Sequence, residues 1–310
     1  MLRPGNPLDI ASMVLLQARA CRNQARSRAV LAAAPSSVLP YGAVLSGPMR
    51  RRDRRVLVHA KRGLVRSVVV AQPRLGRGAW EVSSLHAATG DNDALFEALD
   101  GVASALHGTG AQKVFLRLPA DSRLVHLAGE AQFAPYVAEE LYARWPGAVL
   151  PAPLPAGILR PAGEADAHAL YGLYQSVVPA PAREVEGMTF SQWQESLDMP
   201  RGWRCAQSLA VIREGAAVGW ATLAKSNSRG MLDLLVQRAA VEASESLIAS
   251  AIAPAATSRL LCLLPAYQQY LSRALCAQGF EKAGEFVVLA RHVASRVRLA
   301  KPVPAGVVAE

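Results

Sequence analysis

The chain has 310 residues, 51% of them apolar, which is enough for the cores of two ordinary domains and too many for a disordered chain. The formal net charge is +10, and no run of 18 apolar residues is free of proline or charge, so we expect no membrane-spanning helix. Cys21, Cys205, Cys262 and Cys276 form no CxxC pair and no zinc spacing. We therefore expect no metal site, and free thiols in a reducing, cytoplasmic compartment.

The positive charge is concentrated near the N-terminus. Residues 1–77 carry 15 of the 34 Lys and Arg residues but only two of the 24 acidic residues. Such asymmetry is typical of proteins that bind an anionic partner such as RNA or an acidic protein, and also of a solvated basic face. The densest run contains no aromatic residue, so it would contact phosphates without reading a base sequence. Its members are Arg50, Arg51, Arg52, Arg54 and Arg55.

The first half of the chain predicts a helix followed by a meander of strands. Apolar residues at helical spacing favour a helix from Asp9 to Ala33, and a loop rich in Pro, Gly and Ser follows over residues 34–55. Turns rich in Gly and Pro then separate three predicted antiparallel strands. The later predicted elements are a helix over Asp93–His107, a strand over Lys113–Pro119, a helix over Ser122–Ala131 and strand structure within Phe133–Trp145.

The second half repeats this order after a Pro-rich segment, residues 146–157. Its predicted helices cover Glu164–Val177, Thr189–Leu197, Glu242–Ile252 and Gln268–Gln278. Three strands lie between the second and third of these helices, one strand follows the third, and a last strand covers Glu285–Arg291.

Short sequence echoes support a duplication. "LRPGNPLD" (Leu2 to Asp9) returns as "LRPAGEAD" (Leu159 to Asp166), and "QFAPYVAEELYAR" (Gln132 to Arg144) aligns with "GFEKAGEFVVLAR" (Gly279 to Arg291). The starts, the ends and the order of elements match. We therefore predict two diverged copies of one domain, over residues 1–145 and 158–310, joined by a linker over residues 146–157.

The element order and the placement of these motifs resemble the GNAT (Gcn5-related N-acetyltransferase) family, in tandem. The resemblance covers nearly the whole chain. It implies an α/β (α+β) fold in which each domain has a mixed, mainly antiparallel sheet flanked by helices. It also implies transfer of an acyl group from acyl-CoA, such as acetyl-CoA, to an amine acceptor.

In that family a turn of the form Q/R-x-x-G-x-G/A, after the fourth strand, binds the CoA pyrophosphate through backbone N–H groups at a helix start. In the first copy the matching turn, residues 87–92, keeps only Gly90. In the second copy Arg238 and Ala243 match the ends of the motif, and Val241 replaces the first glycine. The second copy is thus the better candidate for CoA. The candidate cofactor-binding residues are Arg238, Ala239, Ala240, Val241 and Ala243, with Gly90 in the first copy.

The resemblance also suggests catalytic candidates. Family members often carry a carboxylate on the fourth strand, where this chain has Glu81 and Asp233. In the family the general acid is usually a Tyr four residues before the Gly of "GF". In the second copy Leu275 replaces this Tyr, and Tyr267 and Tyr270 lie nearby in the sequence. Each of these residues also fits a plain structural role, as an exposed strand carboxylate or a packing tyrosine.

Two functions therefore stay open from the sequence. One is an acyl-CoA-dependent N-acyltransferase that acts on a small-molecule or peptide amine. The other is a non-catalytic tandem protein whose basic N-terminal half binds an anionic partner, either RNA or a protein. Acyl-CoA binding and salt-dependent polyanion binding would distinguish them.

Overall fold

The computed structural model describes residues 2–19, 23–32, 54–74, 78–147, 158–187, 189–197, 203–226 and 229–293. Its strands form one mixed sheet in the order β1-β2-β3-β4-β5-β12-β6-β11-β10-β9-β8-β7. The first-half strands are β1 (Leu2–Pro4), β2 (Arg55–Lys61), β3 (Leu64–Pro73), β4 (Ala79–Ala87), β5 (Lys113–Pro119) and β6 (Ala134–Arg144). The second-half strands are β7 (Ile158–Pro161), β8 (Arg204–Arg213), β9 (Ala216–Ser226), β10 (Arg229–Val236), β11 (Arg259–Pro265) and β12 (Glu281–His292).

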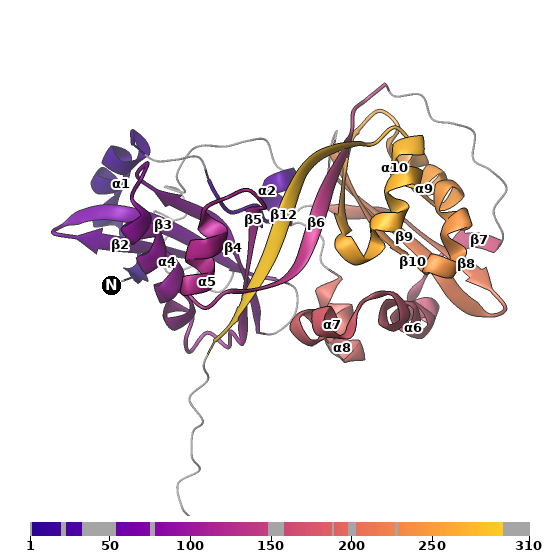
Figure 1. Ribbon diagram of the computed structural model, residues 1–310, viewed down its shortest axis with the longest axis horizontal. Helices are drawn as coiled ribbons and strands as arrows, with labels where there is room; N and C mark the ends of the chain where they lie inside the picture. The colour runs from indigo at the N-terminus through magenta and orange to yellow at the C-terminus, as the bar shows by residue number, and fades with distance from the viewer. Residues whose placement is uncertain are drawn as a thin grey trace, which may run out of the picture.

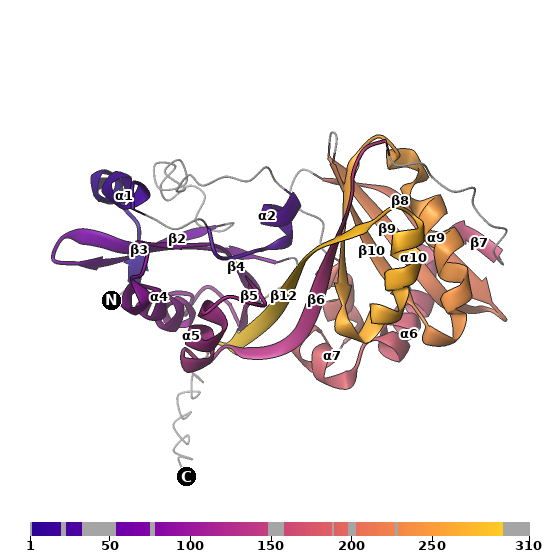
Figure 2. The ribbon, with the colours of Figure 1, turned by 45° about the horizontal axis from the view of Figure 1, so that its top comes forward.

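Helices cover both faces of this sheet (Figures 1 and 2). In the first half, α1 (Ile10–Gln17) and α2 (Arg28–Ala32) lie on one face, and α4 (Asn92–Ala105) and α5 (Leu124–Glu130) lie on the other. In the second half, α6 (Ala167–Val177), α7 (Ala180–Glu186) and α8 (Phe190–Ser196) lie opposite α9 (Ser244–Ile252) and α10 (Ser272–Ala277). Short 3₁₀ helices include η1 (Pro7–Asp9), η3 (Glu164–Asp166), η4 (Arg238–Ala243), η5 (Ala253–Ala255) and η6 (Ala266–Leu271).

Strand alternation explains why both faces are covered. On β8, Leu209 and Val211 pack with the residues of α9, whereas Ala210 packs with those of α6 and α8. Successive side chains of a strand point to opposite faces, so an apolar run such as this one needs a layer of helices on each side.

The repeated sequence motif builds the same structure twice. Arg3 donates to the Asp9 carboxylate at 2.8 and 2.6 Å, and the Asn6 N–H donates to the same carboxylate at 2.9 Å. Arg160 donates to Asp166 at 2.9 and 2.5 Å, and the N–H of Gly163 donates to it at 2.9 Å. A bidentate arginine–carboxylate pair at the start of the first helix therefore explains the spacing in "LRPxxxxD". The predicted tandem arrangement is confirmed.

The last strand of each half lies in the sheet of the other half. β12 pairs antiparallel with β5 over Lys113–Pro119 and with β6, and β6 in turn pairs with β11. Figures 1 and 2 show β6 and β12 running side by side through the middle of the molecule. β12 lies between β5 and β6 of the first half, and β6 lies between β11 and β12 of the second half. The division at residues 146–157 thus separates the chain into halves but does not separate the sheet.

The cores reflect this exchange. Leu289 of β12 is fully buried in the first-half core, beside Leu116 and Phe133. Tyr142 of β6 is buried in the second-half core, beside Leu264 and Phe280. Each half therefore completes its core with a strand from the other half.

Some predicted elements differ in extent. The helix predicted over Asp9–Ala33 is instead two short helices, α1 and α2, because residues 23–26 form hydrogen bonds with strands of the sheet. Of the predicted basic run, Arg55 begins β2 and Arg54 directly precedes it, whereas Arg50, Arg51 and Arg52 lie outside the described residues. Residues 148–157 of the predicted linker also lie outside them. Among the described residues, no helix is long and apolar enough to cross a membrane.

Candidate active site

The candidate site lies where two parallel strands separate. β4 and β5 pair only from Ala79–Lys113 to Glu81–Phe115, and β10 and β11 pair only from Arg229–Arg259 to Leu232–Cys262. Beyond these points β4 and β10 continue. The backbone N–H and C=O groups on the edge of β4 that faced β5, and on the edge of β10 that faced β11, then need other hydrogen-bond partners. Such a gap in a sheet is a natural place for an extended ligand, because the free strand edge offers donors and acceptors in register.

In the first half the chain itself fills this gap. The Asn23 side chain accepts from the N–H of Leu85 at 2.9 Å and donates to the carbonyl of Ser83 at 3.0 Å. The Gln24 N–H donates to the Leu85 carbonyl at 3.2 Å, and the N–H of Arg26 reaches the Arg117 carbonyl on β5 at 2.9 Å. Residues 23–26 thus bridge the two separating strands, and they occupy the edge that a ligand would need.

In the second half one side chain contacts the equivalent edge. Gln268 on η6 is 1% exposed. It accepts from the N–H of Val236 at 3.1 Å and donates to the carbonyl of Leu234 at 3.0 Å. These positions lie two and four residues beyond the last parallel pair, as Ser83 and Leu85 do in the first half. Here, however, no backbone segment among the described residues bridges the two strands, and the gap opens into a cavity.

The cavity has a volume of about 440 Å³ and lies between the halves. This size is typical of small-molecule sites. β10 and the start of η6 form one wall with Asp233, Leu234 and Tyr267. First-half residues, among them Lys113 and Phe115, form another wall, and α7 and α8 close the cavity with Glu186 and Trp193.

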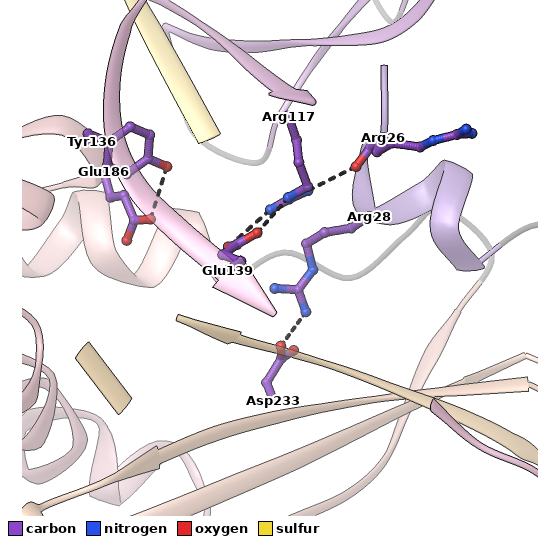
Figure 3. Close-up of polar contacts among 7 residues, drawn as sticks. All are labelled: Arg26, Arg28, Arg117, Tyr136, Glu139, Glu186 and Asp233. Atoms are coloured by element: carbon purple, nitrogen blue, oxygen red, sulfur yellow. Dashed lines mark hydrogen bonds and ion pairs between the residues drawn. The ribbon is translucent and has the colours of Figure 1, made fainter. Parts of the chain in front are cut away.

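Charged groups surround this cavity in defined pairs (Figure 3). Arg117 donates to Glu139 at 2.6 and 3.3 Å, with side chains only 7% and 11% exposed. Arg28, at the start of α2, forms an ion pair with Asp233 on β10. The Lys113 ammonium donates to the carbonyls of Glu184 and Val185 at 2.8 and 3.0 Å.

Glu186 is the cavity carboxylate best suited to accept a proton. The Tyr136 hydroxyl donates to it at 3.1 Å, and no cation lies within 4.0 Å of it among the described residues. Burial raises the pKa of Glu186 above its ordinary value; the positive charge of Arg74 opposes this shift, and the negative charge of Glu139 adds to it. A carboxylate with a raised pKa is a stronger base near neutral pH than an ordinary one.

Aromatic rings make up much of the remaining wall. The rings of Trp193 and Trp220 lie 6.1 Å apart, and Tyr174 lies 6.2 Å from Trp193. The Trp220 indole N–H donates to the Ser208 hydroxyl at 3.0 Å. Burial raises the pKa of Tyr267 far above its ordinary value, so its hydroxyl remains a proton donor throughout the neutral range.

The structure brings together only some of the residues predicted as catalytic. Asp233 and Tyr267 line the cavity. Tyr270 lies at the end of β10, where its hydroxyl donates to the carbonyl of Val236. Glu81 on β4 does not line the cavity, although it pairs in register with the cavity residue Phe115; its carboxylate accepts a hydrogen bond from Gln72 at 2.7 Å.

The two predicted phosphate turns also differ. Gly90 has a positive φ of 81°, but the next residue, Asp91, caps α4 and pairs with Arg66, so a carboxylate of the chain already occupies that helix start. In the second half Arg238–Ala243 form η4, and the Arg238 guanidinium lies 5.5 Å from the centre of the Tyr270 ring. Ala240 and Ala243 are buried under the turn, whereas Val241 and Ala239 are exposed. Glu242 pairs with Arg213 at 2.6 Å and so points its charge at a cation.

Sequence reasoning missed several cavity residues, namely Arg28, Arg74, Arg117, Glu139, Glu186 and Gln268. Five of these are charged, in a chain where 19% of residues are charged, so nothing in the local sequence distinguishes them. They converge through long-range packing, and Glu139 reaches the second-half sheet only because β6 is exchanged.

No family model and no curated protein matches the chain at a significant level. Solved structures do match it. A tandem GNAT protein from the clavulanic acid biosynthesis pathway has a TM-score of 0.56 and 14% identity, over 95% of this chain and 98% of that one. A GCN5-related N-acetyltransferase from Sphaerobacter thermophilus has a TM-score of 0.55 and 17% identity, over 96% and 97%. The chain described here therefore has the tandem GNAT fold.

Proposed function

We propose that this protein is an N-acyltransferase in which only the second half binds acyl-CoA, and that the amine acceptor occupies the central cavity. The observation that carries the proposal is the contrast between the two strand gaps. The first is bridged by the backbone of residues 23–26, whereas in the second only the Gln268 side chain contacts the β10 edge, and the gap opens into a cavity that holds a carboxylate and a tyrosine.

The proposed chemistry assigns one proton transfer to each of these two side chains. The amine nitrogen attacks the thioester carbonyl carbon, its proton passes to Glu186, the C–S bond breaks and an amide forms. Tyr267 donates a proton to the departing thiolate and is reprotonated from solvent, to which Glu186 releases the proton it accepted. The raised pKa of Glu186 favours the first transfer and the raised pKa of Tyr267 keeps the donor protonated.

The pyrophosphate of CoA is assigned to the turn after β10. Arg238 supplies a positive charge there, and the first N–H groups of a helical turn have no partner within that turn. Glu242, the unfavourable acidic residue of this turn, is paired with Arg213. Tyr270 positions Arg238 through its ring.

Acetyl-CoA binding tests this assignment. We expect a rise in melting temperature with millimolar acetyl-CoA or desulfo-CoA and a smaller one with ATP, because a ligand at 100 times its Kd stabilises by about 2.7 kcal/mol. Arg238→Gln should reduce the rise, and Arg123→Gln, which removes the same charge from an exposed site in the first half, should not. The absence of any rise with acetyl-CoA, or an equal rise with ATP, would contradict the proposal.

A further inference from the structure

Two oppositely charged cavity residues, Arg74 and Glu186, form no direct ion pair among the described residues, although each charge shifts the pKa of the other. One is Glu186, whose carboxylate accepts from the Tyr136 hydroxyl. The other is Arg74, which directly follows β3 and whose guanidinium lies 4.5 Å from the centre of the Phe115 ring. In the described part of the chain, neither forms an ion pair within 4.0 Å, although both line the same cavity.

A pair of aromatic rings separates these two charges. Phe115 on β5 and Tyr136 on β6 meet edge to face, with ring centroids 6.0 Å apart. Arg74 lies over the first ring, and Glu186 accepts from the hydroxyl of the second. The cavity therefore offers a cation and an anion at two separated points along one wall.

The other charges of the cavity already have partners. Arg117 is paired with Glu139, Arg28 with Asp233, and Lys113 with two backbone carbonyls. A charge in a partly dehydrated site costs free energy unless an opposite charge or a polar group compensates it. Arg74 and Glu186 act on each other through space, and Glu81 also acts on Arg74, but neither has a directly paired charge, so both remain available for direct contact with a ligand.

We infer that the ligand of this cavity is an amino acid with an apolar or aromatic side chain, the amine acceptor of the acyl transfer proposed above. Its carboxylate lies against Arg74, which offers a planar set of donors suited to two carboxylate oxygens. Its amino group lies against Glu186; the bound ammonium first releases one proton to solvent, and Glu186 accepts the second proton as the nitrogen attacks. Its side chain packs on the rings of Trp193 and Trp220.

Matched ligands can separate these contacts. We would titrate the protein, without acyl-CoA, with L-phenylalanine and L-leucine, with their decarboxylated forms phenethylamine and isoamylamine, and with their deaminated forms 3-phenylpropionate and 4-methylpentanoate. Calorimetry or thermal shift should show at least tenfold tighter binding of one of the two amino acids than of either of its matched analogues. Equal binding of an amino acid and its analogues, or no binding of either amino acid at 10 mM, would overturn the inference.

Two variants assign the charges to residues. Arg74→Gln should weaken binding of the amino acid at least tenfold and leave that of the amine unchanged, and Glu186→Gln should weaken the amino acid and leave the deaminated acid unchanged. Glu184→Gln, at an exposed position on the same helix, should change neither. Equal losses for all three ligands in both variants would contradict the assignment.

Binding without acyl-CoA keeps this test separate from the proposed function. Amino-acid binding without any acetyl-CoA binding would leave the ligand class standing and overturn the acyltransferase. Acetyl transfer to phenethylamine as fast as to L-phenylalanine would leave the acyltransferase standing and overturn the amino acid as its acceptor.

Discussion

At the scale of the residue, we expect Glu186 to affect stability as well as to act in the proposed proton transfer. Its pKa is raised in the folded protein, so its protonated form is the one that folding favours. The stabilising contribution is full below the ordinary glutamate pKa of about 4.3 and is lost as the pH rises through the higher folded value. At neutral pH the charged side chain therefore lowers the stability of the fold.

Replacing Glu186 by Gln should consequently raise the melting temperature at pH 7–8, with a gain that disappears as the pH falls below about 4. The Gln carbonyl can still accept from Tyr136. Acyl transfer should fall by about 100-fold or more, the usual loss when a general base is removed. Thermal unfolding across a pH series, with Glu184→Gln as the control, measures the first effect. A variant less stable than the parent at pH 8 would contradict this assignment.

Asp9 should behave in the opposite way. The hydrogen bonds from Arg3 lower the pKa of its carboxyl, so its contribution is present above the ordinary aspartate pKa of about 3.9 and is lost as the pH falls through the lower folded value. We expect Asp9→Asn to cost about 1–2 kcal/mol at pH 7, since hydrogen bonds to charged groups are stronger than neutral ones but Arg3 is partly exposed.

Urea unfolding of Asp9→Asn at pH 7 and at pH 3 measures this cost. The difference from the parent should be smaller at pH 3. Asp121→Asn, at an exposed position that forms no ion pair among the described residues, should leave the free energy of unfolding within about 0.5 kcal/mol. An equal effect of both substitutions would refute a specific role for the repeated motif.

At the scale of the element, the exchanged strands link the stability of each half to the sequence of the other. Leu289 belongs to the second half of the chain but is fully buried in the first-half core. Leu289→Ala should cost about 2–5 kcal/mol, as buried leucines do. Amide hydrogen exchange should quicken most in β3, β4 and β5.

Leu264→Ala is the matched control, since Leu264 is also nearly fully buried and lies on β11 in the second-half core. There the faster exchange should appear in β9 and β10. Identical exchange maps for the two variants would mean that the cores are not linked through β12 in this way.

At the scale of the whole molecule, neither half can complete its sheet alone. Without β12, strands β5 and β6 would lie two strand spacings apart, about 10 Å, and could not hydrogen-bond. Fragments 1–147 and 158–310 should therefore copurify as a one-to-one complex when they are produced together. Neither should form a folded monomer when produced alone, which size-exclusion chromatography with circular dichroism would detect. A folded, monomeric fragment 1–147 would show that the exchange is dispensable.

Much of the fold follows from local patterns that the sequence displays. The repeat of "LRPxxxxD" corresponds to one structure built twice, because a bidentate pair six residues apart requires the same residue types at the same spacing. Alternating apolar residues and Gly turns indicated the strands of both meanders. The long helix predicted over Asp9–Ala33 was wrong in extent, because hydrogen bonds to strands distant in sequence hold residues 23–26 in a non-helical path.

The sequence by itself determined that this chain contains two copies of an α/β unit, that the units resemble GNAT domains, and that the second keeps more of the phosphate turn. The tertiary structure alone decided which strand gap is filled, which half each last strand completes, and which charges surround the cavity. The reason is physical. Periodicity and turn chemistry act between near neighbours, whereas Arg28, Arg74, Glu139 and Glu186 meet around the cavity only after distant segments have packed and the last strands have been exchanged.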